Sequence, residues 1–113
     1  MSNPQKIVKK MFDQDAFSQW LGIEIIEIKD GYCKLKMTVR KEMLNGFQIT
    51  HGGISYSLAD TALAFASNTH GKKCISVETS ISHTEYVQER DILIATTKEL
   101  SLTEKTGLYL ITI

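Results

Sequence analysis

The stretch NGFQITHGGISYSLADTALAFASN, residues 45–68, decides the fold, because it predicts a long helix with almost no charge. Between Glu42 and Lys72 the only His, Asp, Glu, Lys or Arg residues are His51, Asp60 and His70. Asp60 therefore has no basic partner nearby in the sequence. An isolated carboxylate on an apolar helix needs an explanation, which has to be sought in the rest of the sequence.

The helix predicted over residues 51–68 is apolar on most of its surface. One stripe holds Ile54, Leu58, Ala62 and Phe65, and most of the remainder is covered by Ala59, Leu63, Ala64 and Ala66. Such a helix is typically buried, and a curved sheet wrapped around its length of about 27 Å would bury it. Asp60 lies roughly 160° around the helix from Leu58 and so faces away from the stripe. Something other than the chain's own sheet could therefore cover it.

Strand patterns flank this helix on both sides. Asp30-Gly31 predicts a tight hairpin between two strands, with a bulge at Ile25-Ile26. Three more strands are predicted after the helix, in CISVETSIS (74–82), DILIATTKEL (91–100) and LYLITI (108–113). A short amphipathic helix with a packed aromatic stripe is predicted before the hairpin, over residues 12–21 and ending at Gly22. The order indicates an α+β fold with a mostly antiparallel sheet.

Composition excludes several functions. A chain of 113 residues is one domain, and its formal net charge of zero gives no electrostatic footprint for nucleic acid or a membrane surface. It has no apolar run of the ~20 residues that a spanning helix needs, and residues 1–17 do not resemble a secretory signal. Cys33 and Cys74 lie far apart, which suggests reduced cysteines in a cytoplasmic protein and no zinc site.

The motif NGF (45–47), HGG (51–53), LADTA (58–62) and AFASN (64–68) resembles the hotdog-fold acyl-CoA thioesterases, and most closely their phenylacetic-acid-degradation group. The resemblance covers nearly the whole chain. It implies a single hotdog domain over residues 1–113, in which a curved sheet wraps one long central helix. It also implies an acyl-CoA substrate, aromatic acyl groups such as phenylacetyl among them, and sites at the interface of a homodimer or of a dimer of dimers.

The same resemblance implies roles for individual residues. The family's helical carboxylate maps onto Asp60 as the catalytic group, and the amide that polarises the thioester carbonyl maps onto Gly52. The other implied site residues are Asn45 and His51 beside the reaction, and Gly53, Thr61 and Ser76 in substrate binding. No glycine-rich phosphate loop is present and no cofactor is expected; Lys72 and Lys73 are candidate contacts for CoA.

Family members usually continue further at the C-terminus and add a last strand. Here the sequence stops inside LYLITI, so we expect the last strand to be missing and an apolar sheet edge to be left unpaired.

Thioester hydrolysis requires stabilisation of the carbonyl oxygen and activation of water or a nucleophile. Unpaired amides at a helix N-terminus meet the first need, and glycine leaves them accessible. A carboxylate meets the second, and burial would raise the pKa of such a group and make it a better base. Asp60 could also attack the thioester directly, so base and nucleophile remain open.

Simpler interpretations exist for each residue. Asp60 could hydrogen-bond to Tyr56 or Ser57, His51 could be only a helix cap, and the two glycines only a turn. A non-catalytic acyl-CoA-binding module is the alternative function, and an acyl-thioester hydratase or dehydratase is a third possible function.

The spacing of Gly52 and Asp60 adds one expectation. Gly52 and Asp60 are eight residues apart, or about 12 Å along a helix. One carbonyl group cannot meet both within one chain, which predicts a site shared between two chains.

Overall fold

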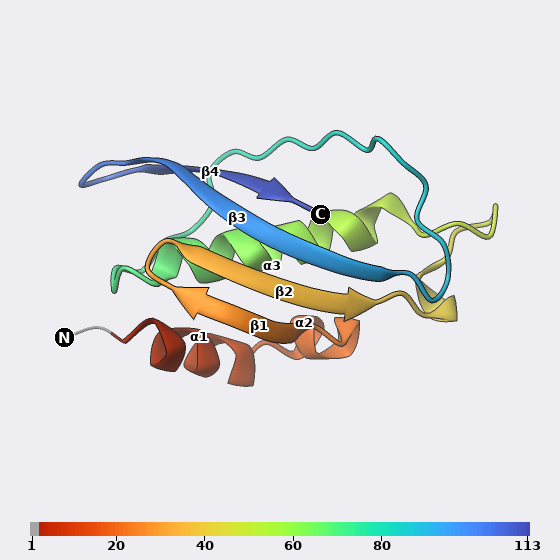
Figure 1. The fold of residues 1–113 in the computed structure, drawn as a ribbon, viewed down its shortest axis with the longest axis horizontal. Coiled ribbons are helices and arrows are strands. Elements are labelled where there is room, and N and C mark those ends of the chain that lie inside the picture. The colour runs from red at the N-terminus through yellow and green to blue at the C-terminus, as the bar shows by residue number, and fades with distance from the viewer. Residues whose placement is uncertain (1–2) are drawn as a thin grey trace.

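The structure is a computed structural model and describes residues 3–113. Two short helices, α1 (Pro4–Asp13) and α2 (Ala16–Leu21), precede a hairpin of β1 (Glu24–Lys29) and β2 (Tyr32–Thr38). The 3₁₀ helix η1 (Lys41–Met43) then leads to the long helix α3 (Gly52–Asn68), which is followed by β3 (Ile92–Leu102) and β4 (Gly107–Thr112). Figure 1 shows the curved sheet lying along α3, with α1 and α2 beside β1.

The sheet is antiparallel throughout, in the order β1-β2-β3-β4. Lys29 pairs with Tyr32 around the predicted turn, where Gly31 adopts a left-handed φ of 70° that favours glycine. The register shifts between Ile25 and Glu27, so the predicted bulge is confirmed. The α+β prediction of a curved antiparallel sheet around one long helix is likewise confirmed.

The core lies between α3 and the sheet. The inward face of β2 supplies Cys33, Leu35 and Met37, with Val39 just beyond the strand, and α3 supplies Leu58, Ala62, Phe65 and Ala66. All of these side chains are at most 1% exposed. Burial raises the pKa of the Cys33 thiol to about 12, and its Sγ donates to the Ala62 carbonyl at 3.3 Å. Cys33 is therefore an unreactive core residue.

The N-terminal prediction of one helix over residues 12–21 is wrong in part. Two helices form, because the Asp15 side chain accepts from the Ser18 amide and starts α2. Gly22 ends α2 with a left-handed φ of 76°, as predicted. The aromatic stripe is only partly packed: Phe12 meets Phe65 edge-on, whereas Phe17 and Trp20 stack on each other and stay about half exposed.

The strand predicted over residues 74–82 does not form. The segment between α3 and β3 has no partner in the sheet, and Ile75 and Val77 are 81% and 94% exposed. It follows α3 as the teal trace in Figure 1. Residues of this segment and of β4 line a cleft of about 1780 Å³. A strand forms only where a neighbouring strand pairs with its backbone N–H and C=O groups. The alternating sequence pattern alone therefore does not make this segment a strand.

Within residues 3–113, the structure has no helix long and apolar enough to cross a membrane.

Candidate active site

The start of α3 leaves one backbone amide free. His51 is the N-cap, and its Nδ1 accepts from the Gly53 amide at 3.3 Å. The His51 carbonyl accepts from the Ile54 amide at 2.9 Å. Among the hydrogen bonds of residues 3–113, none uses the Gly52 amide. An exposed donor therefore stands at the positive end of the helix dipole, where it can bind a carbonyl oxygen or an anion.

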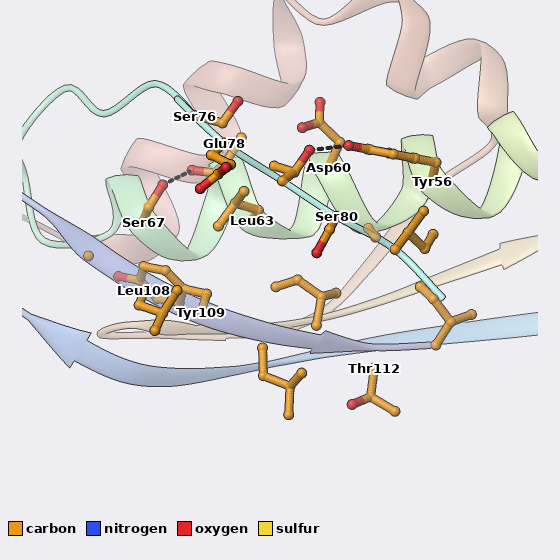
Figure 2. Close-up of a pocket in the computed structure, with 18 of the residues that line it drawn as sticks. Tyr56, Asp60, Leu63, Ser67, Ser76, Glu78, Ser80, Leu108, Tyr109 and Thr112 are labelled. Atoms are coloured by element: carbon orange, nitrogen blue, oxygen red, sulfur yellow. Dashed lines mark hydrogen bonds between the residues drawn. The ribbon is translucent and has the colours of Figure 1, made fainter. Parts of the chain in front are cut away.

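Asp60 lies on the exposed face of the same helix. Its neighbours in sequence Leu58 and Ala62 are buried against the sheet, whereas the Asp60 side chain points away from it (Figure 2). Within the described chain, no hydrogen bond or ion pair includes its carboxylate. In the single chain Asp60 is exposed, because the sheet covers only one side of α3. The expected direction, away from the apolar stripe, is what the structure has.

The structural alternative for Asp60, a hydrogen bond to Tyr56 or Ser57, is not formed. The Tyr56 hydroxyl instead pairs with the Thr79 hydroxyl on the segment that follows α3. Asp60 thus keeps both oxygens available to solvent or to a ligand.

The exposed face of α3 forms one wall of the large cleft. Tyr56, Asp60 and Ser67 line it from the helix, the segment around Ser76 lines it from above, and residues 107–113 line it from β4 (Figure 2). Ser76 is thus brought to the same cleft as Asp60, and Lys72 and Lys73 lie at its rim. The cleft offers apolar surface together with hydroxyl and carboxylate groups, which suits an extended ligand.

Two predicted site residues hold structure in place. The Asn45 Oδ1 accepts from the Phe47 amide at 2.8 Å and from the Ile49 amide at 3.4 Å, which fixes the loop before α3. Thr61 is buried, and its hydroxyl lies 2.9 Å from that of Ser18 on α2. In this single chain Thr61 therefore joins two helices, and its contact with substrate stays a prediction.

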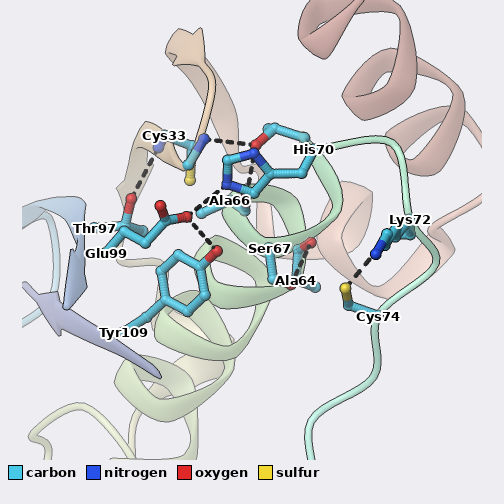
Figure 3. Close-up of polar contacts among 12 residues, drawn as sticks. Cys33, Ala64, Ala66, Ser67, His70, Lys72, Cys74, Thr97, Glu99 and Tyr109 are labelled. Atoms are coloured by element: carbon cyan, nitrogen blue, oxygen red, sulfur yellow. Dashed lines mark hydrogen bonds and ion pairs between the residues drawn. The ribbon is translucent and has the colours of Figure 1, made fainter. Parts of the chain in front are cut away.

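Sequence reasoning missed a cluster at the other end of α3. Glu99 Oε2 lies 2.6 Å from the His70 Nε2 and accepts from the Tyr109 hydroxyl at 2.6 Å (Figure 3). Burial raises the pKa of Glu99, but the hydrogen bonds from Tyr109 and His70 outweigh it, so the net shift is downward. Burial and the Glu99 carboxylate raise the pKa of Tyr109. Only the β3–β4 register, which pairs Glu99 with Tyr109, could have revealed this cluster.

In residues 3–113, no group of three or more His, Cys, Asp or Glu side chains is arranged to hold a metal ion.

Comparison with known proteins identifies the family. Residues 47–113 match the family model of the thioesterase superfamily. The chain is 42% identical over 106 residues to a predicted esterase of Archaeoglobus fulgidus, covering 94% of this chain and 69% of that protein. It is 39% identical over 99 residues to the acyl-coenzyme A thioesterase PaaI of Escherichia coli, covering 88% of this chain and 71% of PaaI.

Structural comparison agrees with the sequence match. The solved structure of the E. coli PaaI protein, from the phenylacetic acid degradation operon, superposes with a TM-score of 0.93 at 36% identity. That match covers 96% of this chain and 78% of the PaaI chain. The protein therefore belongs to the thioesterase superfamily and is a thioester hydrolase with the hotdog fold.

Proposed function

We propose that the protein hydrolyses acyl-CoA thioesters to a free acid and CoA, using the Gly52 amide and the Asp60 carboxylate. The observation that carries this proposal is the pair of unused polar groups on one helix. A free amide stands at the start of α3, and an unpaired carboxylate stands on its exposed face. The similarity to an acyl-coenzyme A thioesterase supports the same substrate class.

The Gly52 amide acts on the thioester carbonyl. It donates a hydrogen bond to the carbonyl oxygen, and the bond strengthens as negative charge grows there in the transition state. The helix dipole acts in the same direction. The adjacent Gly53 amide is already bonded to His51, so the geometry favours Gly52 as the donor from this turn.

Asp60 activates the attacking group. As a general base it takes a proton from water while the water oxygen attacks the carbonyl carbon. The tetrahedral intermediate then expels the CoA sulfur, and the proton passes from Asp60 to the departing thiolate. As a nucleophile, Asp60 would instead attack the carbonyl carbon and expel CoA as the thiolate, which leaves a mixed anhydride. Water would then hydrolyse the anhydride to the free acid and the Asp60 carboxylate.

We further propose that each site is shared between two chains of a homodimer. The two groups are about 12 Å apart along one helix, which is too far for one reacting carbonyl. Both residues are exposed in the single chain, so the surface that carries them is free to meet a second chain. An antiparallel second copy of α3 would bring its Asp60 opposite this Gly52, and two-fold symmetry would form two such sites.

For the acyl group we propose a chemical class and no single compound. The PaaI structure comes from a phenylacetic acid degradation operon, so aromatic acyl-CoA thioesters are the first substrates to test. Lys72 and Lys73 at the rim of the cleft are placed to attract CoA phosphates.

The test is release of free thiol from a panel of aromatic and aliphatic acyl-CoA thioesters. We expect hydrolysis by the wild-type chain and turnover at least ~100-fold lower for Asp60→Asn, the usual effect of losing an acid–base group. Glu78→Gln is the matched control, because Glu78 is another exposed carboxylate of the same cleft. Full turnover by folded Asp60→Asn would exclude the catalytic role. Binding of acyl-CoA without thiol release by the wild type would indicate a binding module instead.

A further inference from the structure

The His83 imidazole lies at the N-terminal end of α3. A Cβ built on Gly52 would be 3.4 Å from the His83 Nε2 and 3.5 Å from its Cε1. The edge of the ring that carries Nε2 thus faces the first residue of the helix. Since Cα–Cβ bonds of a helix tilt toward its N-terminus, this ring edge lies at the same end as the free Gly52 amide.

The two histidines at this helix start differ in what their nitrogens do. The His51 Nδ1 is already used as an acceptor for the Gly53 amide. For His83, the structure of residues 3–113 has no hydrogen bond or ion pair to either ring nitrogen. Neither ring nitrogen of His83 is thus engaged, and its Nε2, on the edge that faces Gly52, can carry the proton of a hydrogen-bond donor.

The backbone around His83 is tethered to the rest of the fold on both sides. Before it, the Thr79 hydroxyl pairs with that of Tyr56 on α3. After it, the Val87 carbonyl accepts from the Thr50 amide at 2.7 Å, just before the helix begins. These contacts hold the segment over the start of α3 although it is not part of the sheet. The backbone that carries His83 is therefore held near the start of α3.

We propose that His83 is a second hydrogen-bond donor to the thioester carbonyl oxygen, beside the Gly52 amide. This inference rests on the proposed function. A histidine side chain can contribute to such a site, and a carbonyl oxygen, with two lone pairs, can accept from two donors. In this role His83 donates a hydrogen bond to the oxygen and transfers no proton. Its role thus differs from that of Asp60, which accepts a proton from the attacking water.

The test compares two substitutions at position 83. His83→Phe keeps an aromatic ring and removes the donor, whereas His83→Gln keeps an N–H donor. We expect His83→Phe to lower kcat about 100-fold, as for loss of one oxyanion donor, with KM little changed. His83→Gln should recover a large part of kcat. Tyr86→Phe is the control, since it removes a polar group from an exposed aromatic residue of the same segment.

The outcomes separate this inference from the proposed function. An inactive wild-type chain would mean that the proposed function fails. An active wild type, with kcat unchanged in His83→Phe and lowered in Asp60→Asn, would leave the function standing and overturn the role of His83. Equal loss of kcat in the Phe and Gln variants would also overturn it, because a donor would then make no difference.

Discussion

At the scale of single residues, Asp60 shows how the sequence and the fold together keep a carboxylate free. The sequence places no Lys or Arg between Glu42 and Lys72, and the fold turns Asp60 away from the sheet. The neighbouring Tyr56 is engaged with Thr79. Both oxygens of Asp60 are left for water or substrate, which explains an isolated carboxylate on an otherwise apolar helix.

Glu99 gives a prediction about stability and pH. Its pKa is lower in the folded chain than its ordinary value, so the folded state favours the charged form. The stabilisation is present above the ordinary pKa of about 4.3 and is lost as the pH falls through the lower folded value. Glu99→Gln should therefore lower the free energy of unfolding at pH 7 by about 1.5–3 kcal/mol, the scale of a hydrogen bond to a charged group. The substitution should also weaken the dependence of the unfolding free energy on pH in the acid range.

Urea unfolding of wild type and Glu99→Gln at several pH values would measure both effects. Glu78→Gln is the control, because Glu78 is an exposed carboxylate outside the cluster. Equal pH dependence in wild type and Glu99→Gln would contradict the role of the cluster.

The sequence could reveal some site residues and not others. His51, Gly52 and Asp60 lie on one helix, so their relative positions follow from helix geometry alone, and the predicted start and end of α3 are confirmed. Glu99 and Tyr109 meet through the register of two strands, and His83 reaches Gly52 from a segment outside the sheet. Such contacts depend on tertiary placement, which no local pattern encodes.

At the scale of elements, the same alternating pattern has two outcomes. Cys33, Leu35 and Met37 alternate on β2, which has β1 and β3 as neighbours, and the predicted strand forms. Ile75 and Val77 alternate in the same way, but no strand lies beside them in the described chain. The pattern indicated which side chains share a face, and the available partners decided whether a strand forms.

The outer strand β4 gives a prediction about association. Within residues 3–113 it pairs only with β3, and Leu108 and Leu110 are 59% and 53% exposed. An unpaired apolar edge is a template for pairing with other chains. Leu110→Lys should therefore reduce the apparent particle size of residues 1–113 in light scattering while the circular dichroism spectrum is retained.

Val77→Lys is the control for added charge. Val77 is 94% exposed and lies outside the sheet of residues 3–113. An equal effect of the two substitutions would attribute the change to net charge. No effect of Leu110→Lys would mean that the β4 edge does not drive association.

At the scale of the whole molecule, the central claim is that one site takes its two groups from two chains. Both lie on the exposed side of α3, about 12 Å apart along its axis.

Gly52→Pro removes the amide with little cost to the helix, because proline is favoured at the first helical position. His51, at φ −60° and ψ 134°, already has the extended geometry that precedes a proline. Gly52→Ala is its control, since it keeps the amide and places Cβ in ordinary contact with His83.

The most direct measurement mixes an Asp60→Asn chain with a Gly52→Pro chain and follows thiol release. Each of the two variants alone should be inactive, and Gly52→Ala, which keeps the amide, should retain more activity than Gly52→Pro. A mixed dimer would hold one intact site and one doubly defective site. With random pairing, half of the dimers are mixed, so about a quarter of the wild-type activity should return. Mixed dimers that form, as judged by differently tagged chains, and yet stay inactive would contradict the shared site and require both groups to act within one chain.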